Sequence, residues 1–260
     1  MKLKIIGSSS KGNCYILENE SEALLIECGV NIDLIKQYLN FNIRKVVGCL
    51  LTHEHGDHAH SLKDVMKLGI NVYSCKGTFE ALGVESGNHT RAKHVNNNDS
   101  FQIGCFKIIN FDVKHDAADP IGFLINHSET GNVLFLTDTY YVPYKFKNLH
   151  NIIVEANYSK EIIEKKRSQG YLPQFLSDRI IRSHMSIETC KELLQANDLS
   201  KVNNIVLIHL SDGNSDAVHF QTEIKIITTS EIMSTPRGEE LEAQGFSYTS
   251  WTYPDRKSTR

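Results

Sequence analysis

One short run of polar residues constrains the possible fold of this chain more than any other feature of its 260 residues. The run reads His-Glu-His-Gly-Asp-His and occupies positions 53–58, directly after the apolar run 46–51, which is typical of a strand buried on both faces. Two imidazoles spaced by one residue project to the same side of an extended segment. Gly56 is expected to let the chain turn sharply, so that the next two side chains point back. Three histidines and one aspartate within six residues can bind two neighbouring metal ions. The alternative interpretation is a His-rich surface loop.

Three further candidate ligands lie at the ends of later apolar runs. His115 follows Phe-Asp-Val-Lys, Asp138 follows Val-Leu-Phe-Leu-Thr, and His209 ends Asn-Asn-Ile-Val-Leu-Ile. Each of them alone fits an ordinary loop residue. Because all three occupy the same kind of position as the run 53–58, we expect them to meet it at one edge of the fold.

The order of predicted elements indicates an α/β fold, a four-layer αββα sandwich. Residues 31–40 have a helical period with Asn31 as the expected N-cap, and 203–209 reads as a buried strand. The remaining expected elements are strands within 3–27, 71–75, 101–137 and 152–157, helices over 62–68, 76–83, 159–169 and 173–195, and a loop over 88–100.

Residues 1–233 are expected to form one folded domain. The segment 234–260 is polar and shows neither a helical nor a strand period. We interpret about its last 15 residues as a disordered tail or one added for expression.

Composition excludes several classes of protein. The net charge is -3 and 40% of the residues are hydrophobic, as in an ordinary folded domain. No apolar run reaches the roughly 18 residues of a membrane-spanning helix, and no secretory signal is visible. The six cysteines are scattered, so we expect free thiols, mostly in the core, and a cytoplasmic protein. A pI near 6.5 argues against a broad basic face, although it allows a local basic groove.

With these motifs in place, the chain resembles the metallo-β-lactamase-fold hydrolases to about residue 230. The resemblance implies one ion held by His53, His55 and His115, and a second by Asp57, His58 and His209. Asp138 would bridge the two ions. A His at 58 and an Asp at 138 correspond to the ligand set of phosphodiesterases and glyoxalases rather than that of true β-lactamases.

Three segments look like the YycJ/WalJ-type exonuclease branch: Gly-Ser-Ser-Ser-Lys-Gly-Asn at 7–13, the surroundings of His115, and Ile-His-Leu-Ser-Asp-Gly-Asn at 208–214. Val-Glu155-Ala-Asn-Tyr and Ser-His184-Met-Ser resemble the tRNA-processing ribonuclease Z group. There the corresponding Glu orients a His that protonates the leaving oxygen. By this resemblance Asp57, Glu155 and His184 are catalytic; the alternative is a strand-end carboxylate and a surface imidazole. The turn 7–13 either contacts phosphate or is a plain hairpin.

The expected activity is therefore that of a two-metal phosphodiesterase, most like a DNA exonuclease, with Zn or Mn as the ions. Two divalent ions, two carboxylates and a bridging hydroxide leave a centre of about +1, which attracts a phosphodiester. The alternatives are a cyclic-nucleotide phosphodiesterase of the phage anti-defence type and, with less support, a thioesterase or lactamase. The implied partners are nucleic acid or a cyclic nucleotide, with no membrane. Related phosphodiesterases are commonly homodimers.

Overall fold

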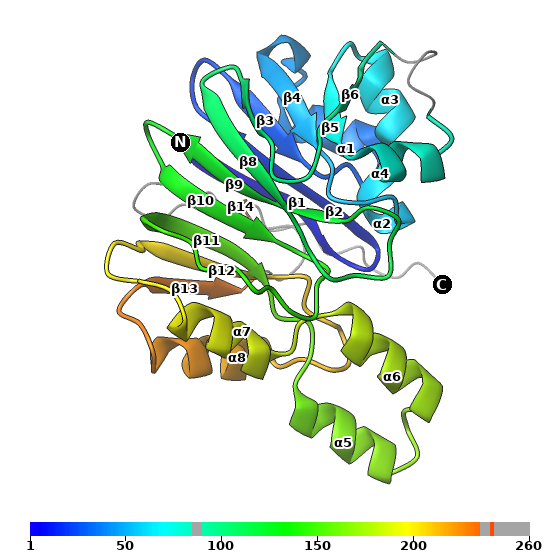
Figure 1. Cartoon of the computed structure of the whole chain (residues 1–260), viewed down its shortest axis with the longest axis vertical. Coiled ribbons are helices and arrows are strands. Elements are labelled where there is room, and N and C mark those ends of the chain that lie inside the picture. Colours follow the sequence, from blue (N-terminus) through cyan, green and yellow to red (C-terminus); the bar gives the residue numbers. More distant parts are fainter. Residues whose placement is uncertain (85–89, 235–239, 242–260) are drawn as a thin grey trace, which may run out of the picture.

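The computed structural model describes residues 1–84, 90–234 and 240–241. Two β-sheets face each other at the centre, and each has seven strands within these residues (Figure 1). The first sheet has the order β14-β1-β2-β3-β4-β5-β6, and the second has the order β13-β12-β11-β10-β9-β8-β7.

The first sheet contains β1 Lys2–Ser9, β2 Gly12–Glu18, β3 Ala23–Ile26, β4 Val46–Leu50, β5 Val72–Ser74, β6 Ala92–His94 and β14 Glu240–Leu241. The second sheet contains β7 Ser100–Ile103, β8 Phe106–Asp112, β9 Ile121–His127, β10 Gly131–Leu136, β11 Leu149–Glu155, β12 Asn204–Ile208 and β13 Glu231–Ser234. The helices are α1 Ile32–Tyr38, α2 Gly56–Ala59, α3 Leu62–Lys67, α4 Lys76–Ala81, α5 Lys160–Ser168, α6 Gln174–Ser183, α7 Ile187–Gln195 and α8 Ala217–Lys225, with a 3₁₀ turn at Ile43–Lys45.

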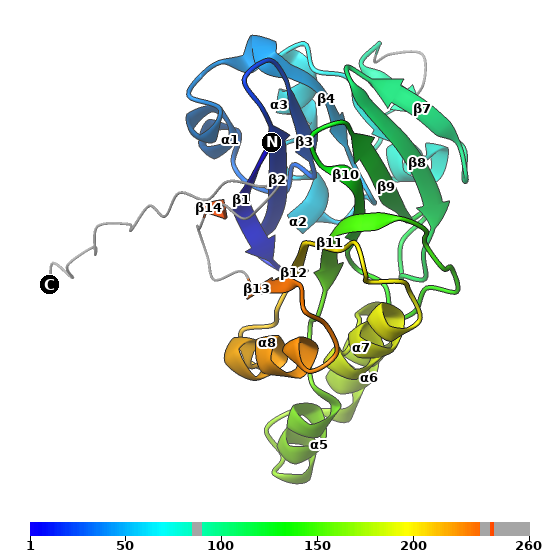
Figure 2. The same cartoon turned by 90° about the vertical axis from the view of Figure 1, so that its left-hand side faces the viewer.

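Three apolar cores separate the four layers. One core fills the space between the sheets, a second lies between the first sheet and α1, α3 and α4, and a third lies between the second sheet and α7 and α8. Strand β10 contributes Phe135 to the central core and Leu134 to the outer one. Because both faces are buried, such strands are apolar without alternation. The predicted αββα sandwich is confirmed (Figure 2).

Several predicted boundaries were wrong. The expected loop 88–100 contains strand β6, which pairs parallel to β5, and it runs into the start of β7. The helical segment 173–195 is two helices, because the chain leaves the helical conformation at His184 and Ser186 caps α7. Helix α8 and strand β13 were not predicted. The Asn31 cap is present, accepting from the Asp33 amide at 2.8 Å.

The C-terminal segment also departs from expectation where it is described. Strand β14 pairs antiparallel with Leu3 and Lys4 of β1 and so extends the first sheet. The tail predicted for about the last 15 residues lies outside the described residues, and the domain boundary at 233 stays a prediction.

Candidate metal centre

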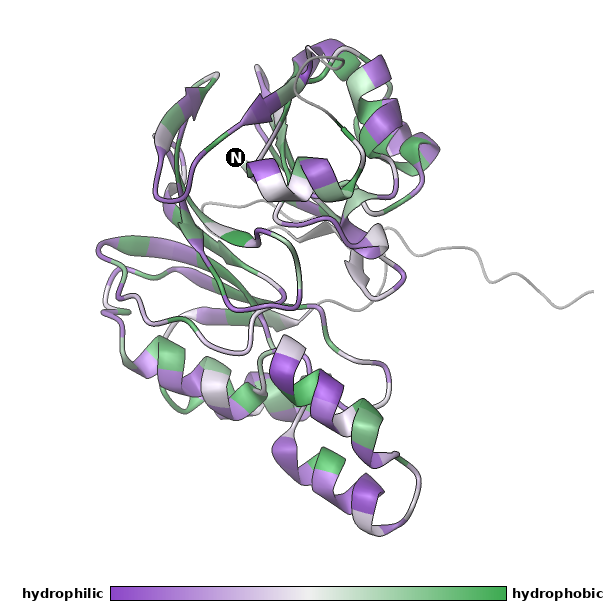
Figure 3. Cartoon of the chain, turned by 45° about the vertical axis from the view of Figure 1, so that its right-hand side comes forward, coloured by the Kyte–Doolittle hydropathy of each residue, from purple (hydrophilic) through white to green (hydrophobic). Residues whose placement is uncertain are grey.

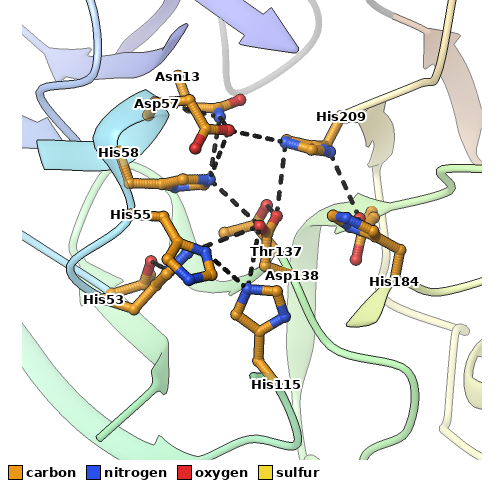
Figure 4. A network of polar contacts seen from close by, with 12 residues as sticks. Asn13, His53, His55, Asp57, His58, His115, Thr137, Asp138, His184 and His209 are labelled. Atoms are coloured by element: carbon orange, nitrogen blue, oxygen red, sulfur yellow. Dashed lines mark hydrogen bonds and ion pairs between the residues drawn. The ribbon is translucent and has the colours of Figure 1, made fainter. Parts of the chain in front are cut away.

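The candidate ligands leave both sheets at the same edge of the sandwich. Strands β10, β11 and β12 are adjacent and parallel, so their carboxyl ends place Asp138, Glu155 and His209 side by side. Strand β4 brings the run 53–58 to this edge from the other sheet, and His115 arrives after β8. Figure 4 shows seven of these side chains directed toward one another: His53, His55, Asp57, His58, His115, Asp138 and His209.

The first ligand group consists of His53, His55 and His115. Their coordinating atoms and an Asp138 oxygen all lie within 4.8 Å of one another. Asp138 Oδ2 lies 3.6 Å from His53 Nε2 and 3.5 Å from His115 Nε2. His55 Nδ1 lies 3.1 Å from His115 Nε2. Two nitrogens that share a tetrahedral zinc ion are separated by about 3.3 Å, so this spacing suits one ion.

The second ligand group consists of Asp57, His58 and His209. Asp57 Oδ2 lies 3.4 Å from His58 Nε2 and 3.5 Å from His209 Nε2. Asp138 reaches this group as well, with Oδ2 3.3 Å from His58 Nε2 and Oδ1 3.6 Å from His209 Nε2. One carboxylate therefore faces both groups.

Charge and hydrogen bonding at this edge suit bound cations. Asp138 and Glu155 are buried, and among the described residues their only ion-pair partners are histidines. Burial alone would raise the pKa of Asp138, but the imidazoles of His209 and His58 hold that pKa well below its usual value, so the carboxylate is ionised. Within the same residues, His53 Nε2 and His209 Nε2 are buried and have no hydrogen-bond partner. Buried carboxylates whose ion-pair partners are imidazoles, beside imidazole nitrogens without a hydrogen-bond partner, are what a site for divalent ions provides.

A second set of polar groups orients the imidazoles, and sequence reasoning missed it. His115 Nδ1 donates to the Ser183 carbonyl at 2.8 Å, which leaves Nε2 with a lone pair for a metal. Thr52 Oγ1 lies 2.9 Å from His53 Nδ1. Buried Glu27 faces His58 Nδ1 at 3.6 Å. Glu27 directly follows β3, so its strand-end position was the signal that could have identified it.

Two asparagines complete this set of supporting contacts. The Asn13 amide nitrogen lies 3.0 Å from His58 Nε2 and 3.2 Å from Asp57 Oδ2. The Asn157 amide nitrogen lies 3.0 Å from His209 Nδ1 and donates to the His209 carbonyl at 2.8 Å. Both act on the second ligand group.

The backbone of the centre is tightly constrained. Glu27, Asp138 and His209 have φ values of 64°, 47° and 54°, in the left-handed region that costs a non-glycine residue about 1–3 kcal/mol. A Cβ on Gly29 would lie 1.6 Å from the Asp57 carbonyl oxygen, so only glycine fits there. The role expected for Gly56 was wrong, because this residue begins α2 without a positive φ and a Cβ there meets open space.

Glu155 and His184 form a pair beside the two ligand groups. His184 Nδ1 donates to Glu155 Oε1 at 2.7 Å, and the amides of Thr139 and Met185 donate to Glu155 Oε2 at 3.1 and 3.2 Å. Burial alone would lower the pKa of His184, but the Glu155 carboxylate outweighs it and raises that pKa above its usual value. The imidazole of His184 stacks on that of His209, with 5.3 Å between ring centroids.

Other expectations have mixed outcomes. The turn 7–13 lies at the centre, where Ser8 Oγ accepts from the His209 amide at 2.9 Å, while the Lys11 side chain is exposed. His127, which is not one of the candidate ligands, is buried with its Nε2 atom 3.2 Å from Glu22 Oε1. All six cysteines are free thiols, with Cys105 exposed and the others buried.

No helix within the described residues has the length and apolar character needed to cross a bilayer.

Comparisons with known proteins agree with this geometry. Residues 23–210 match the family model of the beta-lactamase superfamily domain. The chain is 29% identical over 230 residues to exodeoxyribonuclease WalJ of Streptococcus pneumoniae, and the alignment covers 82% of this chain and 83% of WalJ. It is 26% identical over 227 residues to exodeoxyribonuclease YycJ of Bacillus anthracis, covering 83% and 84%.

Among solved structures, the metallo-beta-lactamase fold protein YhfI of Bacillus subtilis superposes with a TM-score of 0.69 at 16% identity, over 92% of this chain and 97% of YhfI. That likeness confirms the fold. With the family match over 23–210 and the ligand groups at one sheet edge, the chain belongs to the beta-lactamase superfamily and is a metal-dependent hydrolase.

Proposed function

We propose that this protein is a two-metal phosphodiesterase that hydrolyses nucleic acid, acting as a DNA exonuclease. The observation that carries the proposal is the shared carboxylate of Asp138, which faces both ligand groups beside the Glu155–His184 pair. A centre with two ligand groups and a separate imidazole provides charge stabilisation and a proton donor for cleavage of a P–O bond.

Each ligand group would hold one divalent ion, Zn or Mn, with Asp138 between them. Ions held there would activate water for attack and stabilise negative charge on the phosphate. Asp138 and Asp57 would offset part of the charge of the ions, and the hydrogen bond from His115 Nδ1 to the Ser183 carbonyl leaves His115 Nε2 free to bind one of them.

His184 would protonate the leaving oxygen. Its Nδ1 hydrogen is committed to Glu155, so in the imidazolium form the transferable proton is on Nε2. The Glu155 carboxylate raises the pKa of His184, which favours this protonated form. Glu155 acts through His184, orienting the ring and stabilising its positive charge.

The relatives support the choice of polymer. Both WalJ and YycJ are named exodeoxyribonucleases and align with most of this chain. We extend that substrate class to this protein and expect it to act in the cytoplasm.

A substrate panel tests the proposal. The protein loaded with Mn or Zn is incubated with linear duplex DNA, single-stranded DNA, RNA and 3′,5′-cyclic mononucleotides. We expect DNA to be shortened progressively from its ends, and the His53→Ala/His55→Ala control to be inactive. Ring opening of cyclic nucleotides with DNA untouched would replace the exonuclease with the cyclic-nucleotide alternative. Failure to hydrolyse any phosphodiester would refute both.

A further inference from the structure

A helical arm outside the sandwich has a surface that the proposed reaction does not use. Helices α5 and α6 project from the body of the molecule in both views (Figures 1 and 2). Residues 160–184 carry six basic and three acidic side chains, which is a net charge of +3. Because the net charge of the whole chain is -3, the residues outside this segment carry a net charge of -6. The basic residues are Lys160, Lys165, Lys166, Arg167, Arg179 and Arg182.

One face of α6 combines an aromatic ring with two guanidinium groups. Phe175, Arg179 and Arg182 are spaced i, i+4 and i+7, so they form a stripe along the helix. All three are exposed, Phe175 by 76%, while Ser177 on the opposite side is buried. Neither arginine has a salt bridge or side-chain hydrogen bond to any residue that the structure describes. Tyr171, exposed by 79%, lies in the turn just before the stripe. Figure 3 shows hydrophobic and hydrophilic residues alternating on this arm.

The stripe ends at the metal centre. Helix α6 stops at Ser183, whose carbonyl accepts from His115, and His184 follows directly. Phe175 precedes Ser183 by eight residues, which at 1.5 Å per residue is about 12 Å along the helix axis. At a rise of 3.4 Å per nucleotide, that distance corresponds to about four nucleotides of a stacked strand.

We propose that the stripe Phe175–Arg179–Arg182, with Tyr171 beside it, binds the single DNA strand that extends from the metal centre. The inference rests on the proposed function. Guanidinium groups contact backbone phosphates, and exposed rings stack on bases without regard to sequence. Because the rest of the protein is acidic, the electrostatic attraction for DNA phosphates is concentrated on this basic arm.

The charge of the arm favours a polyanion over a second copy of this chain. In a twofold interface the same patch meets itself, so the arginines of one arm would face those of the other. A strand of phosphates neutralises the same charges.

The test compares DNA length dependence in two matched variants. Phe175→Ser/Arg179→Gln alters the stripe, and Phe41→Ser/Lys63→Gln removes an exposed ring and an exposed cation elsewhere. We measure kcat/KM on oligothymidylates of increasing length, together with bis(p-nitrophenyl) phosphate, a phosphodiester too short to reach the arm. In the wild type and the control, kcat/KM rises until the strand spans about four nucleotides beyond the cleaved bond. On the longer oligothymidylates, kcat/KM of the stripe variant is roughly 10- to 100-fold lower than that of the wild type.

Binding provides a readout that does not depend on turnover. In the His53→Ala/His55→Ala background, the stripe variant binds a fluorescein-labelled oligothymidylate more weakly, and its salt dependence has a slope smaller by about 0.7. If binding and the length gain both survive in the stripe variant, the inference is wrong. A wild-type dimer that becomes monomeric in the stripe variant, with the length gain retained, would assign the patch to self-association instead. If the wild type leaves bis(p-nitrophenyl) phosphate and oligonucleotides intact but the binding difference remains, the proposed function fails and the strand-binding arm stands.

Discussion

The two ligand groups of the metal centre are supported by different kinds of neighbour. In the first group, His53 and His115 have their Nδ1 atoms next to uncharged oxygens of Thr52 and Ser183. In the second group, the corresponding atoms of His58 and His209 face the buried carboxylates of Glu27 and Glu155, at 3.6 and 3.5 Å.

The two ligand groups also differ in how many residues support them and in where along the chain those residues lie. A carboxylate behind an imidazole makes the ligand more basic as well as orienting it. Glu27 and Asn13 reach the second group from other strands of the first sheet, and Glu155 reaches it from the second sheet. Each group takes two of its three ligands from the run 53–58, but the first group is supported by fewer groups, namely Thr52 just before that run and the Ser183 carbonyl. We therefore expect the second group to depend more on the integrity of the whole fold.

The largest effect should come from the residue that both groups share. Asp138→Ala removes the carboxylate that lies within 3.6 Å of four of the five ligand histidines, namely His53, His58, His115 and His209. We expect both ions to be lost and phosphodiesterase activity to fall below detection, with metal content read by mass spectrometry of the desalted protein. A variant that keeps one ion would show that the groups are independent and that Asp138 does not bridge.

A smaller loss is expected from a residue outside both groups. His184→Ala should reduce kcat by about 10²–10⁴-fold, because the leaving oxygen loses its proton donor. Both ions should stay bound, which distinguishes a proton donor from a ligand. Loss of metal in this variant would make His184 a ligand of the second group.

Backbone packing offers a way to disturb the second group alone. Gly29→Ala forces the Asp57 carbonyl away and should destabilise the protein by about 3 kcal/mol, with preferential loss of the second ion. The control is Gly56→Ala, next to Asp57 in the run 53–58, where an added Cβ meets open space. This variant should leave the thermal unfolding temperature and the metal content nearly unchanged. Equal effects at the two positions would contradict the packing described.

The smallest effect concerns the carboxylate support itself. Glu27→Gln should weaken binding of the second ion by about 10–100-fold and leave the first unaffected. Thr52→Val makes the matched change behind His53 and should weaken only the first ion, by less. Competition with a chromogenic chelator measures both affinities, and a reversed order would overturn the distinction between the groups.

Local sequence was enough for part of this protein. The apolar run 46–51 followed by two imidazoles and an Asp-His pair identifies a strand-end metal motif, since the ligand spacing is short and set by local backbone geometry. Their positions at the ends of apolar runs added His115, Asp138 and His209, the resemblance assigned them to ions, and the structure brings all three to that motif. The αββα layers could also be predicted, because buried strands and helices have distinct apolar patterns.

Only the tertiary structure decided what surrounds these ligands. Glu27, Asn13 and Asn157 are ordinary polar residues in the sequence, and they become supports because strands far apart in the chain end at one edge. Gly29 matters and Gly56 does not, since a Cβ clash depends on which backbone lies opposite. Strand β6 was missed because its pairing partner stabilises it more than its own residues do. Chemistry carried by neighbouring residues can be predicted from sequence, whereas contacts between distant residues exist only once the chain has folded.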